Sequence, residues 1–417
     1  MQGGQTVVER WLPGITREVV EHGGLLIDPD RFAVHINGAR QMPSGDIPIL
    51  QSTRPLLEAR IRSRVLALPN VEALSARATG LEFRDDAVSA VRYVADGVEN
   101  AVATEFVVDA MGRASRLSDW VEGAGFDRPR LERMRTGVRY ATALFERVPT
   151  PKYPEAAITL AQYPDPLRPG PGGVVAGLVL PVENRQWMAG VVTSGDRPPI
   201  ASIEELRAVF AGMPPHFADA GGGAVTRALA NFSQADSRRR DFTGLTRFPA
   251  RLVSVGDAVA SFNATYSQGM SSAAFHACCL SEYLTGKPDL DVPAAGYFAL
   301  QEVMVDALWA VSASGDAARM DAVRGIEVAP EVQRQRWATD QLMQATLSDE
   351  TVARAFMDVA SMLAHPLSLA DPALLDRAIA ANQAAAAARR RPLSRGASPG
   401  RTPGSARIVP GGVPPLG

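Results

Sequence analysis

The stretch from Gly256 to Met270 contains the residues whose types and spacing are best suited to chemistry. Asp257 follows the short apolar run 251–255, and an aspartate at the carboxyl end of a buried parallel strand can accept hydrogen bonds from sugar or ribityl hydroxyls. Gly269 opens a helical pattern, so free N–H groups and the positive end of a helix dipole would lie near an anionic group. By itself, the dipeptide Gly256-Asp257 is better explained as a turn at a strand end.

Two further segments carry weaker signals. The nearly continuous apolar run 105–109 stops at Ala110-Met111-Gly112, which is typical of a buried parallel strand followed by a loop. Arg238-Arg239-Arg240 precedes Asp241 and favours a solvated turn, although the phosphates of a reductant could bind there.

Other residues that often carry chemistry are poorly placed for it. Cys278 and Cys279 are neighbours, so a disulfide between them would be strained, and neither has metal-ligand spacing to another residue. No Gly-x-Ser-x-Gly segment occurs, and the histidines show no HxH or HxxxH spacing. The histidines are His22, His35, His216, His276 and His365. The sequence therefore predicts no metal site and no catalytic residue, and favours packing or surface roles for these histidines.

The elements that position these residues follow from hydrophobic periodicity. Residues 6–22 have a helical pattern broken at Pro13-Gly14, and a second helix runs from Arg54-Pro55 to about Pro69-Asn70. Extended stretches are then predicted at 71–76, 80–84, 87–94 and 101–109. Residues 130–250 mostly alternate between Gly/Pro-rich turns, which indicates a mostly antiparallel sheet. A strand at 251–255, a helix from about 269 and helices over 294–385 complete the order. This order favours a nucleotide-binding α/β domain interrupted by an inserted sheet domain.

Composition excludes several classes of protein. The 417 residues are 46% apolar and 21% charged, with a net charge of −2, which leaves no electrostatic footprint for nucleic acid. No apolar run approaches the roughly 20 residues of a membrane-spanning helix. The first five residues lack a secretory pattern, so we expect a cytoplasmic protein. Residues 381–417 contain six arginines, no acid and few large apolar residues, which predicts a disordered basic tail.

The string 256–270 as a whole closely resembles the GD motif of FAD-dependent monooxygenases of the aromatic-hydroxylase superfamily. It looks most like the branch of polyether epoxidases and squalene-monooxygenase-like enzymes. Ser52–Glu58 resembles the SRPLLE-like helix start of that branch, Val107–Arg116 resembles its DATGRxSR motif, and Phe248–Leu252 leads into the GD string in the usual way. The resemblance covers about residues 1–380, and its motifs are specific for the superfamily but not for a substrate.

The resemblance implies an α/β fold with a FAD/NAD(P)-binding, glutathione-reductase-like domain, an inserted mostly antiparallel β-sheet substrate domain and C-terminal helices. The implied parts are the FAD-binding domain at 1–130 and 246–295, the substrate sheet at 131–245, a helical region at 296–380 and the tail at 381–417. The family begins with a strand, a GxGxxG turn and a helix, and this sequence shows no such unit. We therefore expect a FAD-binding domain that lacks its first βαβ unit through a misplaced start, with a hydrophobic sheet edge exposed.

The resemblance also assigns roles by position. Asp257, with Gly256, would bind the ribityl or pyrophosphate region of FAD. The other implied cofactor-binding residues are Gly269 and Met270 at the isoalloxazine edge, Asp109, Gly112 and Arg113 in the loop beside the cofactor, and Arg54 near the flavin side chain. Phe262 and Tyr266 would line the substrate pocket, with core packing as the alternative. Ala264 and Ser267 replace the usual proline and glycine of the GD string, and Ser267 fits only if its φ is negative.

The activity that the resemblance implies is a monooxygenase reaction, epoxidation or hydroxylation through a flavin C4a-hydroperoxide, as in secondary metabolism. The substrate would be a small apolar polyketide, terpenoid or aromatic compound, since the predicted sheet offers few convergent charges. Besides FAD, the reaction needs O2 and electrons from NAD(P)H or from reduced flavin made by a separate reductase. The absence of WxWxIP disfavours a halogenase. Two alternatives remain: a flavin-dependent polyprenyl-type reductase, and a truncated, non-catalytic remnant that does not hold FAD.

Overall fold

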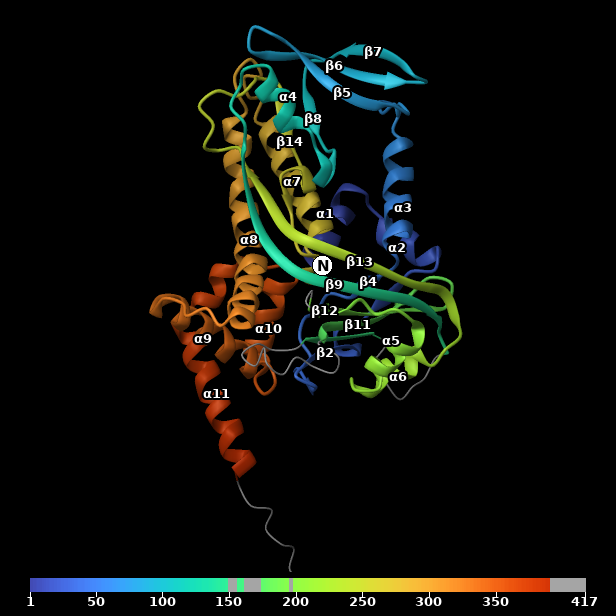
Figure 1. The fold of residues 1–417 in the computed structure, drawn as a ribbon, viewed down its shortest axis with the longest axis vertical. Helices are drawn as coiled ribbons and strands as arrows, with labels where there is room; N and C mark the ends of the chain where they lie inside the picture. Colours follow the sequence, from blue (N-terminus) through green and yellow to red (C-terminus); the bar gives the residue numbers. More distant parts are fainter. Residues whose placement is uncertain (149–155, 161–173, 195–197, 391–417) are drawn as a thin grey trace, which may run out of the picture.

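The computed structural model describes residues 1–148, 156–160, 174–194 and 198–390. Figure 1 shows a long curved sheet in the middle of the molecule, a smaller α/β part above it and a group of helices at its other end. The mixed α/β fold class predicted from the sequence is confirmed, as are the sheet in the middle of the chain and the helices that follow it.

The helices follow from local signals. The break at Pro13-Gly14 separates α1 from α2, because Gly14 has a φ of +85°. Thr53 caps α3 by accepting a hydrogen bond from the backbone N–H of Leu56 at 3.4 Å. The helices are α1 Gln2–Trp11, α2 Ile15–Glu21, α3 Arg54–Leu66, α4 Leu117–Gly123, α5 Ile203–Phe210, α6 Pro215–Gly221, α7 Gly269–Thr285, α8 Ala295–Arg324, α9 Pro330–Ala345, α10 Glu350–Ala360 and α11 Pro372–Arg390.

Within the described residues the large sheet has eight strands, and all neighbouring pairs are antiparallel except β10 and β2. In spatial order they are β15 Ala260–Ser261, β13 Val225–Asp241, β9 Arg130–Glu146, β12 Gln186–Ser194, β11 Val174–Val182, β10 Ala156–Leu160, β2 Phe32–Ile36 and β3 Ala39–Arg40. Helices α5 and α6 cover one face, where Phe145, Phe210 and Phe217 are fully buried. Strand β11 is almost wholly apolar because Val179 packs on this side and Val175 packs on the other.

The smaller α/β part contains two parallel strands, β8 Val107–Asp109 and β14 Leu252–Ser254. Helix α8 packs behind them, and the hydroxyl of Tyr297 donates a hydrogen bond to the carbonyl of Ser254 at 3.0 Å. Among the described strands β8 pairs only with β14, and Val108 of β8 is 39% exposed. The remaining strands are β1 Leu25–Ile27 with β4 Ile49–Gln51, and β5 Arg77–Arg84, β6 Ala87–Ala95 and β7 Val98–Ala103.

Several predicted boundaries are wrong. Residues 71–76 form no strand, and the stretch 101–109 is divided into β7 and β8. Residues 381–390 continue α11 instead of starting a disordered tail, because the run of alanines is a strong helix former and Ala378 packs against α9 and α10. Residues 391–417 lie outside the described residues.

Among the residues that the structure describes, no helix combines the length and apolarity needed to cross a bilayer. The same residues contain no group of three or more His, Cys, Asp or Glu side chains arranged to hold a metal ion.

Candidate functional site

The loops after β8 and β14 leave the sheet at the same edge, since Asp109 and Ser254 are register partners in a parallel pair. The carboxylate of Asp109 is buried and fully engaged. It accepts hydrogen bonds from the Met111 backbone N–H at 3.0 Å, the Ser115 hydroxyl at 2.6 Å and the Ser254 hydroxyl at 3.1 Å. Asp109 therefore ties the two loops together, and its oxygens are occupied by the protein.

Asp257 lies beside this junction and has a different environment. It lies in a short 3-10 turn, η4 Gly256–Ala258. The first residue of this turn, Gly256, has a φ of +59°. No described residue donates a hydrogen bond to its carboxylate. Burial raises the pKa of Asp257, while the charges of Arg54 and Arg113 oppose that rise. A half-buried carboxylate without a protein donor is available to accept hydrogen bonds from a ligand.

The start of α7 faces Asp257. A methyl group on Gly269 would lie 3.8 Å from Asp257 Oδ1 and would meet no other atom within 4 Å. Met270, next in the helix, is 38% exposed. Gly112, in η2 Gly112–Ala114, has a φ of +70° and open space around its Cα. Two glycines thus leave room for a ligand to approach the backbone at both loops.

The two predicted arginines reach the same region in different ways. Arg54 is the first residue of α3, and its side chain is 71% exposed and pairs with Glu58 at 2.7 Å. Arg113 is less exposed, hydrogen-bonds the Ser261 hydroxyl at 3.2 Å and forms an ion pair with Asp236. The structure therefore brings Asp109, Arg113, Asp257 and Gly269 together near the ends of β8 and β14, while Arg54 is linked to them only through the effect of its charge on Asp257.

One face of α7 carries polar atoms that the sequence reasoning missed. Gln268, Ser272 and His276 are spaced by four residues, and Gln268 Oε1, Ser272 Oγ and His276 Nε2 are buried without a hydrogen-bond partner among the described residues. His276 Nδ1 accepts the backbone N–H of Gly256 at 2.8 Å and so fixes the turn that carries Asp257. The regular four-residue spacing after the GD string was the available signal.

His276 gives a prediction about acid stability. Burial lowers its pKa to about 4, whereas an unfolded histidine titrates near 6.5. Between these values the unfolded chain binds more protons, so the free energy of unfolding falls as pH drops from 6.5 toward 4. His276→Gln keeps an acceptor for Gly256 but does not titrate. In urea unfolding, the free energy of unfolding of the variant should fall by about 3 kcal/mol less than that of the parent over this pH range. His216, whose pKa burial also lowers to about 4, is present in both proteins, so equal pH dependences would contradict the assignment to His276.

The predicted substrate residues are placed differently. Phe262 is only 5% exposed and packs near Trp309 in the core, so its side chain is not available to a ligand in this conformation. Tyr266 lies in η5 Ala264–Tyr266 with its hydroxyl against Gly315 of α8. Ser267 has a φ of +55°, so the condition that serine fits here only with a negative φ is wrong; a left-handed residue is needed to end η5 before α7 starts.

A buried polar network holds this loop against the sheet. The Tyr140 hydroxyl of β9 donates to Asn263 Oδ1 and accepts the Thr265 N–H at 3.1 Å. Asn263 Nδ2 donates to Asp316 of α8 at 2.9 Å, and Asp316 pairs with Arg319 at 3.1 Å. The sheet, the GD loop and α8 are thus joined by a single chain of hydrogen bonds.

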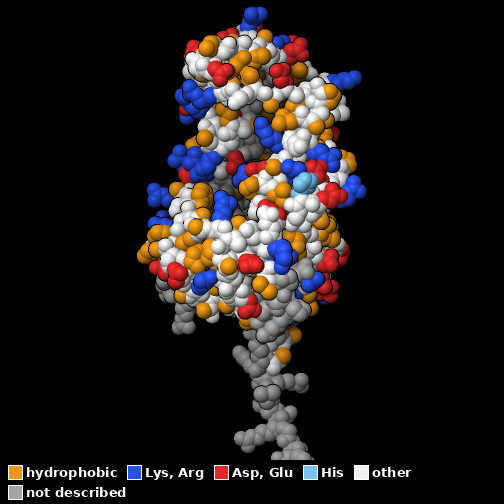
Figure 2. Space-filling model, turned by 90° about the vertical axis from the view of Figure 1, so that its right-hand side faces the viewer, with side chains coloured by type: hydrophobic (Ala, Val, Ile, Leu, Met, Phe, Trp, Pro, Cys, Tyr) orange, Lys and Arg blue, Asp and Glu red, His pale blue; other side chains and the backbone are white. Residues whose placement is uncertain are grey.

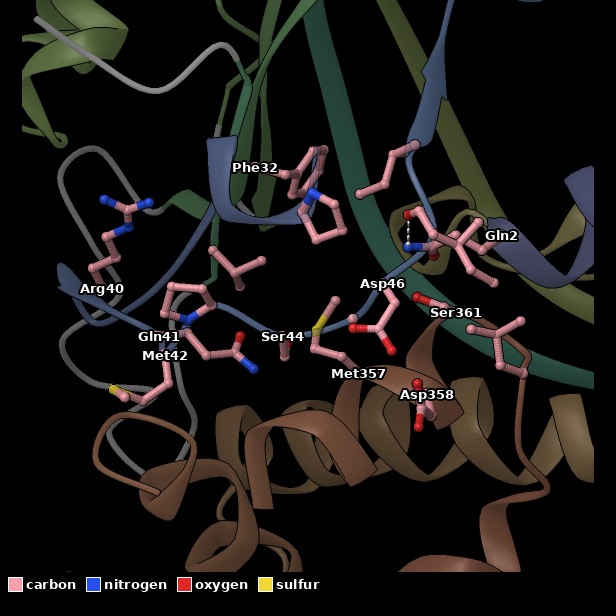
Figure 3. Close-up of a pocket in the computed structure, with 17 residues that line it drawn as sticks. Gln2, Phe32, Arg40, Gln41, Met42, Ser44, Asp46, Met357, Asp358 and Ser361 are labelled. Carbon is pink, nitrogen blue, oxygen red and sulfur yellow. Dashed lines mark hydrogen bonds between the residues drawn. The ribbon is translucent and has the colours of Figure 1, made fainter. Parts of the chain in front are cut away.

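A small pocket lies elsewhere, between the β2–β4 segment and α10 (Figure 3). Gln41, Asp46 and Asp358 face it, and Gln41 Nε2 is buried without a partner. Its volume of about 20 Å³ is enough for about one water molecule. A bound water would satisfy Gln41, but a substrate would not fit.

No family model matches the sequence. Protein Rv3254 of Mycobacterium tuberculosis strain H37Rv is 28% identical over 403 residues, which span 92% of this chain and 82% of that protein.

Several solved structures resemble this one. Klebsiella pneumoniae HpxO complexed with FAD and uric acid has a TM-score of 0.59 at 17% identity, covering 88% of this chain and 87% of that one. The flavin-dependent brominase Bmp2 has a TM-score of 0.58 at 14% identity, covering 91% and 87%. PqsL from Pseudomonas aeruginosa, a probable FAD-dependent monooxygenase, has a TM-score of 0.55 at 20% identity, covering 78% and 87%. At these identities the likeness establishes the fold alone, which this chain shares with these three proteins.

Proposed function

We propose that this chain is a FAD-dependent oxidoreductase, a monooxygenase that hydroxylates or epoxidises an apolar polyketide, terpenoid or aromatic compound. The observation that carries the proposal is the meeting of three features at one sheet edge: the Asp109 loop, the Gly256-Asp257 turn and the start of α7. The fold shared with flavin-dependent enzymes supports it.

The residues at this edge fit FAD. Asp257 has a carboxylate without a protein donor, which suits ribityl hydroxyls. Gly112 and Gly269 leave space for the cofactor to approach the backbone. Gln268 Oε1 is a buried acceptor that lacks a donor, and the imide N–H of an isoalloxazine ring is such a donor. When bound, FAD would supply the redox chemistry and the reaction with O2.

The protein's own part is to orient the substrate and exclude water. Tyr140 of β9 and Phe232 of β13 lie with ring centroids 5.7 Å apart, beside the loop that Tyr140 holds. Phe232 is 58% exposed, so the sheet presents an aromatic surface next to the candidate flavin site. This surface supports an apolar substrate. Electrons would come from NAD(P)H or from flavin reduced by a separate enzyme.

The direct test is a titration of the purified full-length chain with FAD, followed by visible absorbance after removal of unbound flavin. We expect about one flavin per chain to remain bound. A colourless protein would overturn the proposal and favour a non-catalytic remnant. If flavin is retained, incorporation of labelled oxygen into a product separates a monooxygenase from a reductase, which would reduce a polyprenyl compound without oxygen uptake.

Gly269→Ala separates cofactor binding from folding. The added methyl group meets only Asp257 Oδ1, at an ordinary contact distance of 3.8 Å, and alanine favours helix over glycine. We therefore expect an unchanged or slightly higher melting temperature. FAD affinity should fall by about tenfold, because the methyl group occupies the space through which the cofactor approaches the helix start. Unchanged affinity would place the flavin away from Gly269.

A further inference from the structure

A cluster of arginines lies on one face of the paired strands β9 and β13. Arg135 and Asp236 are register partners, as are Arg133 and Arg238, so these four side chains share a face of the antiparallel pair. Arg113 reaches the same place from η2 and pairs with Asp236. The run Arg238-Arg239-Arg240 is thus part of a strand, and the expectation of a solvated turn is wrong.

This cluster has a surplus of positive charge. Asp236 accepts hydrogen bonds from Arg113 and from Arg238, the latter at 3.1 Å, and Arg133 lies 3.8 Å from its second oxygen. Burial raises the pKa of Asp236, but the hydrogen bonds from Arg238 and Arg113 outweigh burial and lower it, so this carboxylate is ionised at neutral pH. Arg135 forms no ion pair with any residue that the structure describes. Arg113 also acts on the charge of Asp257, so two carboxylates oppose four guanidinium groups, which leaves two positive charges uncompensated.

The neighbouring residues on β13 are arranged otherwise. Arg239 points to the opposite face and is neutralised by Glu132 at 2.7 Å and Asp306 at 2.5 Å. Arg240 donates to the carbonyls of Ala258 and Ser115 and so bridges the two candidate cofactor loops. The uncompensated charge is therefore confined to the face that Arg113 shares with the candidate flavin site.

We propose that Arg113, Arg133, Arg135 and Arg238 form a binding site for an oxyanion, a phosphate or carboxylate group carried by a second ligand. Arg133 is free to contact the oxyanion, because its side chain is 58% exposed and lies too far from Asp236 to donate a hydrogen bond to it. Guanidinium groups bind such anions through paired N–H donors. Figure 2 shows the face on the right of Figure 1, which is hollowed at mid-height and carries Lys and Arg side chains, together with Asp and Glu side chains, around the hollow. The source of the anion is either the phosphates of the reductant or an acid group on the substrate, and this part of the inference rests on the proposed function. The binding of the anion does not depend on it.

The test is calorimetric titration of the full-length chain, without FAD, with sodium pyrophosphate. We expect binding that weakens with added salt and that falls at least about tenfold in Arg133→Gln/Arg135→Gln. Arg130→Gln is the matched control, because Arg130 is also exposed on β9 but belongs to the opposite face. Equal binding by the parent and the double variant, or an equal loss in the control, would overturn the proposal.

Competition identifies the source of the anion. Displacement of pyrophosphate by NADPH assigns the site to the reductant, and displacement by octanoate but not by octanol assigns it to an acidic substrate. Displacement by neither ligand would show that the site holds an adventitious anion only and would overturn the proposal. Displacement by FAD would overturn it too, because the arginines would then hold the cofactor's own phosphates. A chain that binds pyrophosphate but no FAD would refute the proposed function and leave the anion site intact.

Discussion

Asp257→Ala is expected to weaken FAD binding by about ten- to a hundredfold, the largest effect on function predicted for a single residue. Hydrogen bonds to a charged acceptor are worth about 1.5–3 kcal/mol, and the Asp257 carboxylate has no other partner among the described residues. Because no described residue donates a hydrogen bond to this carboxylate, its removal should not lower the free energy of unfolding. The flavin-free variant should therefore be at least as stable as the parent. Flavin fluorescence titration measures the FAD affinity, and urea unfolding measures the stability of the flavin-free variant.

The matched control is Asp219→Ala, which removes an exposed carboxylate from α6, a helix that packs on the large sheet away from the β8–β14 loops. We expect neither its FAD affinity nor its stability to change. Should Asp257→Ala bind FAD as tightly as the parent, the ribityl chain does not contact this turn. Should Asp257→Ala unfold much more easily, its carboxylate has a structural role instead.

The part of this site that could be predicted from the sequence is the part made by local structure. A short apolar strand followed by a loop brings its own polar residues to the strand end, so the residue pattern predicts one strand end at Asp109 and another beside Asp257. That the two loops lie beside one cofactor is implied by the resemblance, and so is an exposed apolar edge, which follows from the βαβ unit that the sequence does not show.

The missed residues depend on contacts between distant segments. Asp236 and Arg238 reach Arg113 only because β13 runs for 17 residues along β9, and the letters RRRD give no sign of that length. In a strand the three arginines alternate between faces, so one is neutralised against α8 while its neighbours face the cofactor loops. His276 was assigned to packing or the surface, since nothing in its sequence indicates that Nδ1 holds the N–H of Gly256.

Arg319→Met is expected to cause the largest loss of stability, about 3–5 kcal/mol, measured by urea unfolding. Arg319 and Asp316 form an ion pair on α8 whose side chains are 5% and 2% exposed, and Arg319 also donates to the carbonyl of Thr136 on β9. Burial raises the pKa of Asp316 while Arg319 opposes that rise, so removing Arg319 leaves a buried carboxylate without its counter-charge. Arg334→Met is the control: it breaks an exposed pair with Glu331 on α9 and should change stability by less than about 1 kcal/mol.

A double variant distinguishes packing from positioning at this pair. Replacing a whole buried ion pair with apolar residues of similar volume is often nearly neutral, so Asp316→Leu/Arg319→Met should regain most of the stability that Arg319→Met loses. It should not regain FAD affinity, because Asp316 also receives both hydrogen bonds from Asn263 Nδ2, and Asn263 orders the loop before α7 through Tyr140. A stable double variant with weakened FAD binding would show that the pair positions the GD loop. If Arg319→Met is within about 1 kcal/mol of the parent, the pair does not support the fold, and the loop must be held by its other contacts, which include those with Tyr140 and Gln234.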